Sequence, residues 1–143
     1  MNVKQALKLK AKLLKEISEL YHIAISTNSI EVGNIRRFSV ANSLKNAMTK
    51  TNELVELKGK IHRANISVYN RIFLMAELKG AVNRLKKVNT DEGVVNGNGY
   101  RPTTENKEVE LNAVELLLMV KSIEDEIEVL QEELDVHNAT TEI

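Results

Sequence analysis

Apolar residues recur every three or four positions along most of this 143-residue chain. That spacing places them on one side of an α-helix. It predicts a helix over about residues 3–25, a second over about 43–64 and a third over about 71–87. Ser43 is a residue type that favours the N-cap position, so we expect it to begin the second helix. The segment 65–70 is expected to break or bend the path between the second and third helices.

The clearest repeat lies near the end of the chain, over residues 113–137. Apolar residues there alternate at spacings of three and four for more than three heptads, with Glu and Asp at most positions between them. The repeat predicts a coiled-coil seam or the apolar face of a bundled helix, through which we expect the protein to self-associate. The residues of this self-association seam are Leu116, Val120, Ile123, Ile127, Leu130 and Leu134.

Helical spacing lapses over residues 26–42, where Asn and Gly punctuate a stretch rich in β-branched residues. Such a composition allows a short β-hairpin, which would turn near Gly33 and Asn34. This segment is the first expected break between helices.

The second break, residues 89–104, contains the string GVVNGNGYRP at 93–102. Its Asn-Gly pairs supply the positive φ angles that tight turns require. A phosphate-binding loop would need a buried strand before it and a helix N-terminus directly after it, and this pattern has neither. We therefore expect a turn, the tip of a small hairpin with Val94, Val95 and Tyr100 in its arms.

Together these patterns predict an all-α fold that can include a minor β-hairpin, built from long antiparallel helices in a helical bundle or coiled coil. We expect residues 1–143 to form a single elongated helical domain, with breaks near 26–42 and 89–104. The chain has five aromatic residues and no Trp, so its core must be aliphatic. An abundance of aliphatic residues, Lys and Glu is typical of coiled coils and long helices.

The charges divide the chain although its formal net charge is zero. Residues 1–90 hold 17 Lys and Arg against 6 Glu, and residues 91–143 hold 3 against 14 Asp and Glu. These charges lie on the outer faces of periodic helices rather than in blocks of one sign. We therefore expect the two portions to attract each other, within one molecule or between copies.

The chain contains no cysteine, which excludes disulfides, thiolate metal sites and Cys nucleophiles. Its first helix carries Lys every three or four residues and resembles neither a signal peptide nor a membrane span. We expect a cytoplasmic protein without a membrane partner, or a virion protein if the chain is encoded by a phage.

Candidate catalytic chemistry is sparse. The three histidines are dispersed, and the motifs of zinc proteases, serine hydrolases and P-loop enzymes do not occur. Glu19 and His22 have the Glu-x-x-His spacing of di-metal helical bundles, but such a site needs a second pair and two further inward Glu residues. We expect no enzyme, no catalytic residue, no metal and no cofactor.

Nucleic-acid binding is the alternative function. Four lysines follow one face of the first helix, and two arginines precede Phe38, an arrangement suited to phosphate contact and base stacking. A basic outer face is equally typical of a helix that packs on a partner helix through its apolar stripe. The candidate contacts are Lys4, Lys8, Lys12, Lys15, Arg36 and Arg37.

The order of these features resembles the septicolysin-like family of uncharacterised bacterial proteins. Its members begin with Met-x-x-x-x-Ala-Leu, here Met1 to Leu7, and then have a break containing Asn and Gly, here residues 28–33. They continue through an Ile-Asn-x-Thr-Asn-like turn, here residues 61–65. A Tyr-bearing basic loop, here Tyr100 and Arg101, precedes a last helix that ends in Asn-Trp-Thr-Thr-Glu-Leu, here residues 138–143 with Ala139 in place of the Trp.

The resemblance implies a helical protein that forms homo-oligomers, without established catalytic residues. It also marks Tyr100 and Arg101 as a candidate functional loop. We therefore expect a non-enzymatic structural or scaffolding protein that self-assembles through amphipathic helices. Its partners would be further copies of itself and other structural proteins, and a phage virion component is one concrete form.

Overall fold

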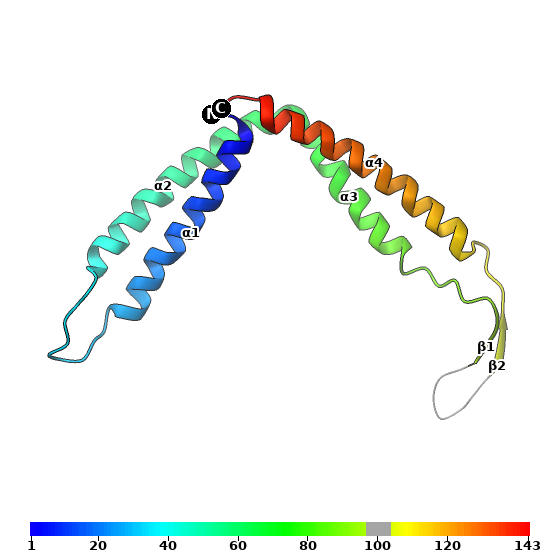
Figure 1. Ribbon diagram of the computed structural model, residues 1–143, viewed down its shortest axis with the longest axis horizontal. Helices are drawn as coiled ribbons and strands as arrows, with labels where there is room; N and C mark the ends of the chain where they lie inside the picture. Colours follow the sequence, from blue (N-terminus) through cyan, green and yellow to red (C-terminus); the bar gives the residue numbers. More distant parts are fainter. Residues whose placement is uncertain (97–103) are drawn as a thin grey trace. The chain divides into compact units, whose positions relative to one another are not determined.

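The computed structural model describes residues 1–96 and 104–143. The fold is all-α with a minor antiparallel β-hairpin, which confirms the predicted fold class (Figure 1). A bundle or coiled coil stays a prediction. The elements in chain order are α1 (Val3–Thr27), α2 (Val40–Asn65), the 3-10 helix η1 (Ile66–Val68), α3 (Tyr69–Leu85), β1 (Gly93–Asn96), β2 (Thr104–Lys107) and α4 (Ala113–Thr140).

The chain divides into two compact units. The terminal unit comprises Met1–Ser67 and Asp135–Ile143, and the central unit comprises Val68–Leu134. The terminal unit contains α1, α2 and the last turns of α4. The central unit contains α3, the β-hairpin and the rest of α4.

Side chains of small polar residues begin both helices of the terminal unit. Asn2 caps α1 by accepting from the Gln5 backbone N–H at 2.9 Å, and the Gln5 side chain accepts from the Asn2 N–H in return. Ser39 caps α2 by accepting from the Asn42 N–H at 3.2 Å. The prediction that Ser43 is the cap was wrong, because this small residue is buried within α2 and its hydroxyl bonds back to the Ser39 carbonyl.

Helices α1 and α2 lie side by side and antiparallel, and their backbones approach closely (Figure 1). Ala6 of α1 and Ala47 of α2 are fully buried, and such small side chains allow a short distance between helix axes. Larger aliphatic residues fill the core beside them. This core cluster comprises Ala6, Leu13, Leu54, Leu57 and Ile61, with Ile17 and Ile143 packed against it.

Residues 28–39 form a loop between α1 and α2, so the hairpin predicted near 26–42 was wrong. Gly33 has a φ of 93° and the Asn34 N–H donates to the Glu31 carbonyl, so the chain does turn at the predicted position. The Arg36 guanidinium instead donates to the carbonyls of Thr27 and Asn28, which ties this segment to the end of α1. Val32 and Ile35 remain exposed.

Strands β1 and β2 pair antiparallel, with Gly93 opposite Lys107 and Val95 opposite Glu105. Val94 and Val95 therefore lie in one arm of a hairpin, as predicted. The predicted place of Tyr100 in the other arm falls outside the described residues.

Helices α3 and α4 also run antiparallel and side by side, but their backbones lie further apart than those of α1 and α2 (Figure 1). Arg71 Nε lies 2.7 Å from Glu133 Oε2 near one end of the pair. Lys86 Nζ lies 3.4 Å from Glu124 Oε1 towards the other end. These ion pairs join a basic helix to an acidic one within the central unit.

Candidate interaction surfaces

The predicted self-association seam lies inside the central unit. Leu116, Val120, Leu130 and Leu134 are buried, and Ile123 and Ile127 are partly buried. Val82 of α3 is buried as well, on the helix that runs alongside. The seam is thus covered within its own chain.

A second stripe, in which exposed apolar residues are interspersed with charged ones, follows the opposite side of α4. A step of two residues turns the chain by about 200° around a helix axis, so Leu118 faces away from the buried Leu116. Leu118 is 62% exposed, and Val114 and Val129 are exposed by a similar fraction. We call this set the α4 outer stripe: Val114, Leu118, Lys121, Asp125, Val129 and Glu132.

Helix α3 carries a matching stripe on the side away from its buried face. Phe73 precedes the half-buried Met75 by two residues, and Gly80 precedes the buried Val82 by two, so both turn outward. Phe73 is 60% exposed, and the Tyr69 ring stacks on it with centroids 5.6 Å apart. We call this set the α3 outer stripe: Tyr69, Phe73, Ala76, Gly80 and Arg84.

The two outer stripes also hold charges that the chain does not pair. Among the residues that the structure describes, neither Arg84 of α3 nor Asp125 and Glu132 of α4 has an ion-pair partner. Arg71 and Lys86, by contrast, pair across α3 and α4. Arg84, Asp125 and Glu132 therefore lie on the sides that also expose apolar residues.

Two of the predicted nucleic-acid contacts on α1 have carboxylate neighbours, and one in the following loop bonds to the end of that helix. Lys12 and Lys15 each lie 3.8 Å from a carboxylate one turn further along α1, Glu16 and Glu19 respectively. The Arg36 guanidinium donates to the carbonyls of Thr27 and Asn28, at the end of α1.

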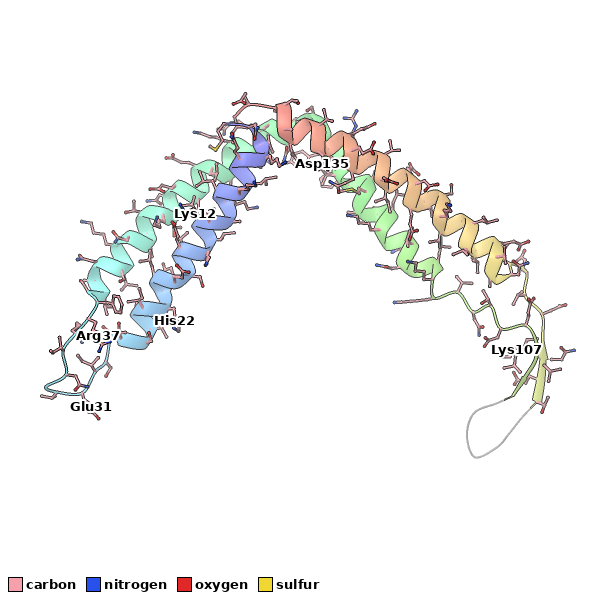
Figure 2. All side chains as sticks on the ribbon, in the orientation of Figure 1. Lys12, His22, Glu31, Arg37, Lys107 and Asp135 are labelled. Carbon is pink, nitrogen blue, oxygen red and sulfur yellow. The ribbon has the colours of Figure 1, made fainter. Side chains whose placement is uncertain are left out.

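Lys4, Lys8 and Arg37 lie at different places along the α1 and α2 hairpin. Lys4 and Lys8 are exposed near the start of α1, where they border a hollow with Asp135 and Asn138. Arg37 lies in the loop at the opposite end of the α1 and α2 hairpin, with Lys12 between (Figure 2). The four lysines therefore share one exposed face along α1, whereas Arg36 and Arg37 lie in the loop beyond the end of that helix.

One ion pair links α1 to α2. Lys50 Nζ donates to Glu16 Oε2 at 2.7 Å, and both side chains are about one third exposed. This hydrogen bond lowers the pKa of Glu16 below its ordinary value and raises the pKa of Lys50 above its own. The pair is an electrostatic tie between the helices of the terminal unit.

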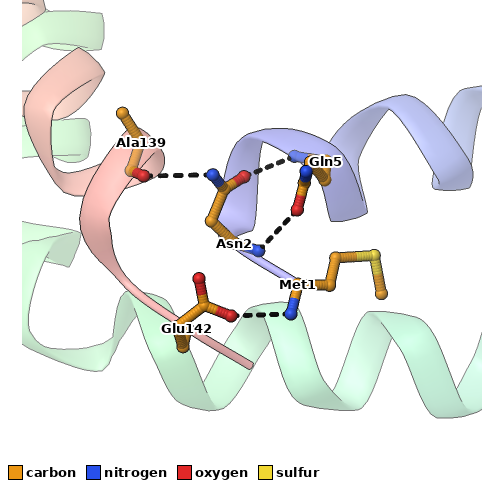
Figure 3. A network of polar contacts seen from close by, with 5 residues as sticks. All are labelled: Met1, Asn2, Gln5, Ala139 and Glu142. Atoms are coloured by element: carbon orange, nitrogen blue, oxygen red, sulfur yellow. Dashed lines mark hydrogen bonds and ion pairs between the residues drawn. The ribbon is translucent and has the colours of Figure 1, made fainter.

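The two ends of the chain are bonded to each other (Figure 3). The Met1 ammonium lies 2.6 Å from Glu142 Oε2, and the Asn2 side-chain amide donates to the Ala139 carbonyl at 3.0 Å. Backbone bonds from Val3 N–H to the Thr141 carbonyl and from Ile143 N–H to the Met1 carbonyl complete the contact. We call this arrangement the terminal clasp. It brings residues 1–3 together with residues 139–143.

The sequence indicates the helix cap within the terminal clasp but not the contact between the two ends of the chain. Asn2 and Gln5 have the spacing of a reciprocal helix cap. Nothing in the local pattern of residues 138–143 indicates that they return to the first helix, because that contact depends on the path of the whole chain.

The described residues hold no cluster of metal ligands and no membrane-spanning helix. Over residues 1–96 and 104–143, no three or more His, Asp or Glu side chains gather in a way that could hold a metal ion. Glu19 and His22 are both exposed on α1. No helix within these ranges is long and apolar enough to cross a bilayer.

The candidate functional loop of Tyr100 and Arg101 lies outside the described residues. The resemblance to the septicolysin-like family stays a prediction. The chain matches no protein family model, no curated protein and no solved structure.

Proposed function

We propose that this protein is a non-enzymatic structural or scaffolding component that self-associates through helix faces of its central unit. The observation that carries the proposal is the exposure of Phe73 and Leu118 on the sides of α3 and α4 opposite to their buried faces. Exposed apolar residues bordered by polar ones mark an interaction site in a folded protein. Covering them contributes about 25 cal/mol per Å² of apolar area removed from water.

The surface that supports this proposal differs from the predicted seam. Leu116, Val120, Leu130 and Leu134 are covered within the chain, whereas the two outer stripes are left to solvent. Self-association through amphipathic helices therefore remains our proposal, with the contact moved to the other side of α4.

A cytoplasmic scaffold or a phage virion component is the concrete form we propose. A scaffold needs repeated contacts between copies, and two outer stripes on one helical hairpin provide two such surfaces. Other structural proteins could share the same contacts.

Sedimentation velocity of the full chain tests this proposal. We expect the sedimentation coefficient to rise with concentration in the micromolar range, because copies cover one another's outer stripes. A well-folded monomer throughout that range would contradict self-association.

Nucleic-acid binding is the second candidate, and the exposed Lys4, Lys8 and Arg37 favour it. Phosphate contacts would give an affinity that falls steeply with salt. Absence of any DNA or RNA mobility shift at about 50 mM salt would remove this candidate. Loss of a shift in Lys4→Gln/Lys8→Gln, but not in Lys12→Gln, would locate it on the first turns of α1.

A further inference from the structure

We propose that copies of this chain assemble head to tail, with the α3 outer stripe of one copy docked on the α4 outer stripe of the next. The occupant of each exposed stripe is thus a second copy of the same chain. The inference rests on the proposed self-association and specifies its surfaces, its partner and its symmetry.

The two outer stripes face away from each other within one chain. The inner side of α3, which includes Met75 and Val82, and the inner side of α4, which includes Leu116 and Val120, lie on neighbouring antiparallel helices joined by ion pairs. Each outer stripe lies on the reverse of its own inner side. One chain therefore cannot cover its α3 stripe with its own α4 stripe, and a second copy must do so.

Charge selects which stripes pair. Helix α4 holds eight carboxylates and one lysine, whereas α3 holds three cations and one carboxylate. The α4 stripe carries Asp125 and Glu132 against the single cation Lys121, so two α4 stripes in contact would bring net negative charge together. An α3 stripe instead offers Arg84 to these unpaired carboxylates. Complementary charges favour the right partner and like charges suppress the wrong one.

Side-chain size along the stripes is also compatible with this pairing. Ala76 and Gly80 leave little side-chain bulk in the middle of the α3 stripe, and both sit between Phe73 and Arg84. Branched residues such as Leu118 and Val129 protrude from the α4 stripe. Protruding side chains on one helix packing between residues of another is the usual contact of antiparallel helical pairs.

A contact between two different stripes is heterologous, so it has a definite consequence for symmetry. Each copy added to an assembly presents one stripe that is still uncovered. Repetition of the contact gives a closed ring if the rotation between copies closes, and an open filament if it does not. A symmetric contact of α4 on α4 would instead stop at a dimer.

Two variants block the two halves of this contact separately. Phe73→Glu places a carboxylate on the α3 stripe, and Leu118→Lys places an ammonium on the α4 stripe; both positions are exposed. Asn70→Glu is the matched control, because it adds the same charge as Phe73→Glu at an exposed position on α3 outside the stripe. Circular dichroism establishes that each variant keeps its helices.

Sedimentation velocity of each variant alone and of an equimolar mixture then gives the test. We expect each blocked variant to sediment as a monomer and Asn70→Glu to sediment as the wild type. The mixture should sediment as a dimer, because the intact α4 stripe of Phe73→Glu meets the intact α3 stripe of Leu118→Lys.

Other outcomes separate this inference from the proposed function. A wild-type chain that is monomeric contradicts self-association itself. If the wild type assembles while Phe73→Glu also assembles normally, self-association stands and the head-to-tail contact is overturned. A mixture that stays monomeric overturns the head-to-tail contact as well.

Discussion

The two antiparallel helical hairpins of this protein use their apolar residues in different ways. In the α1 and α2 hairpin, exposed apolar residues such as Leu14 and Met48 border the buried face of the same helix. In α3 and α4, exposed residues such as Phe73 and Leu118 lie on the side opposite to the buried face. A helix with one apolar side can bury it against one neighbouring helix, whereas a helix with two apolar sides needs a second neighbour to bury both.

The α1 and α2 hairpin is also packed more closely than the α3 and α4 hairpin. Ala6 and Ala47 are fully buried where α1 and α2 meet, and the backbones of these helices approach more closely than those of α3 and α4. The first hairpin nevertheless leaves Met48 and Val55 of α2 55% and 63% exposed, so its close packing does not cover every apolar side chain. The second hairpin is the part of the molecule that another copy would complete.

The largest contrast should come from shortening one leucine in each hairpin. Leu54→Ala leaves a cavity in the core of the terminal unit and should lower the free energy of unfolding by about 2–5 kcal/mol. Leu118→Ala, on the exposed stripe, should change it by about 0.5 kcal/mol or less. Urea unfolding at low protein concentration measures both. Equal losses would show that Leu118 is as buried as Leu54, contrary to the comparison.

Enlarging one alanine in each hairpin should give the next largest effect. Ala47→Leu forces extra volume between α1 and α2 and should cost about 1–3 kcal/mol. Ala76→Leu lies on the exposed α3 outer stripe and should leave the unfolding free energy within about 0.5 kcal/mol of wild type. Thermal unfolding of both variants checks this difference. A well-tolerated Ala47→Leu would argue against a close α1 and α2 contact.

Helix capping offers a third comparison between the units. Asn2 caps α1, and Asn112 accepts from the Glu115 N–H at 2.9 Å at the start of α4. Replacing either by Ala should cost about 0.5–2 kcal/mol. Asn2→Ala should cost more, because it also removes the bond to the Ala139 carbonyl in the terminal clasp. A larger loss for Asn112→Ala in urea unfolding would show that the bond from Asn2 to the Ala139 carbonyl adds no stability.

Lowering the pH should have the smallest effect on stability, and it should destabilise the terminal unit. The pKa of Glu16 is lowered in the folded state by its hydrogen bond from Lys50, so its contribution is present above the ordinary value of 4.5 and is lost as pH falls through the lowered pKa. The raised pKa of Lys50 keeps its charge until pH exceeds 10.5.

Variants at neighbouring carboxylates test this pH dependence. Glu16→Gln should flatten the decline of the unfolding temperature below pH 4.5. Glu19→Gln leaves the bond between Glu16 and Lys50 in place and should retain the wild-type decline. Identical acid profiles for Glu16→Gln and the wild type would remove this pair as a source of pH-dependent stability.

Much of the helical layout was predictable because it depends on local spacing. The seam residues from Leu116 to Leu134 lie on one side of α4, and α1 extends only two residues beyond its expected end. Ser43 was mistaken for a cap because Ser39 and Ser43 are equally suitable by type. Packing of a small side chain against α1 decides between them, and that packing is not a local property.

The interaction surfaces were harder to predict. Ala76 and Gly80 are too small to stand out as apolar positions, so the stripe that begins at Tyr69 and Phe73 was missed, although its spacing of four, three and four residues was present. The seam on α4 was recognised as an apolar face, but spacing alone does not say whether the chain or another copy covers it. That depends on where α3 lies.

The molar mass of the wild-type chain in solution tests the central claim most directly. Light scattering at increasing micromolar concentrations should give a mass that exceeds 16.1 kDa and rises with concentration, because the outer stripes of α3 and α4 are covered by further copies. A folded chain that keeps the mass of one copy at every concentration would contradict the claim that its central unit is completed by self-association.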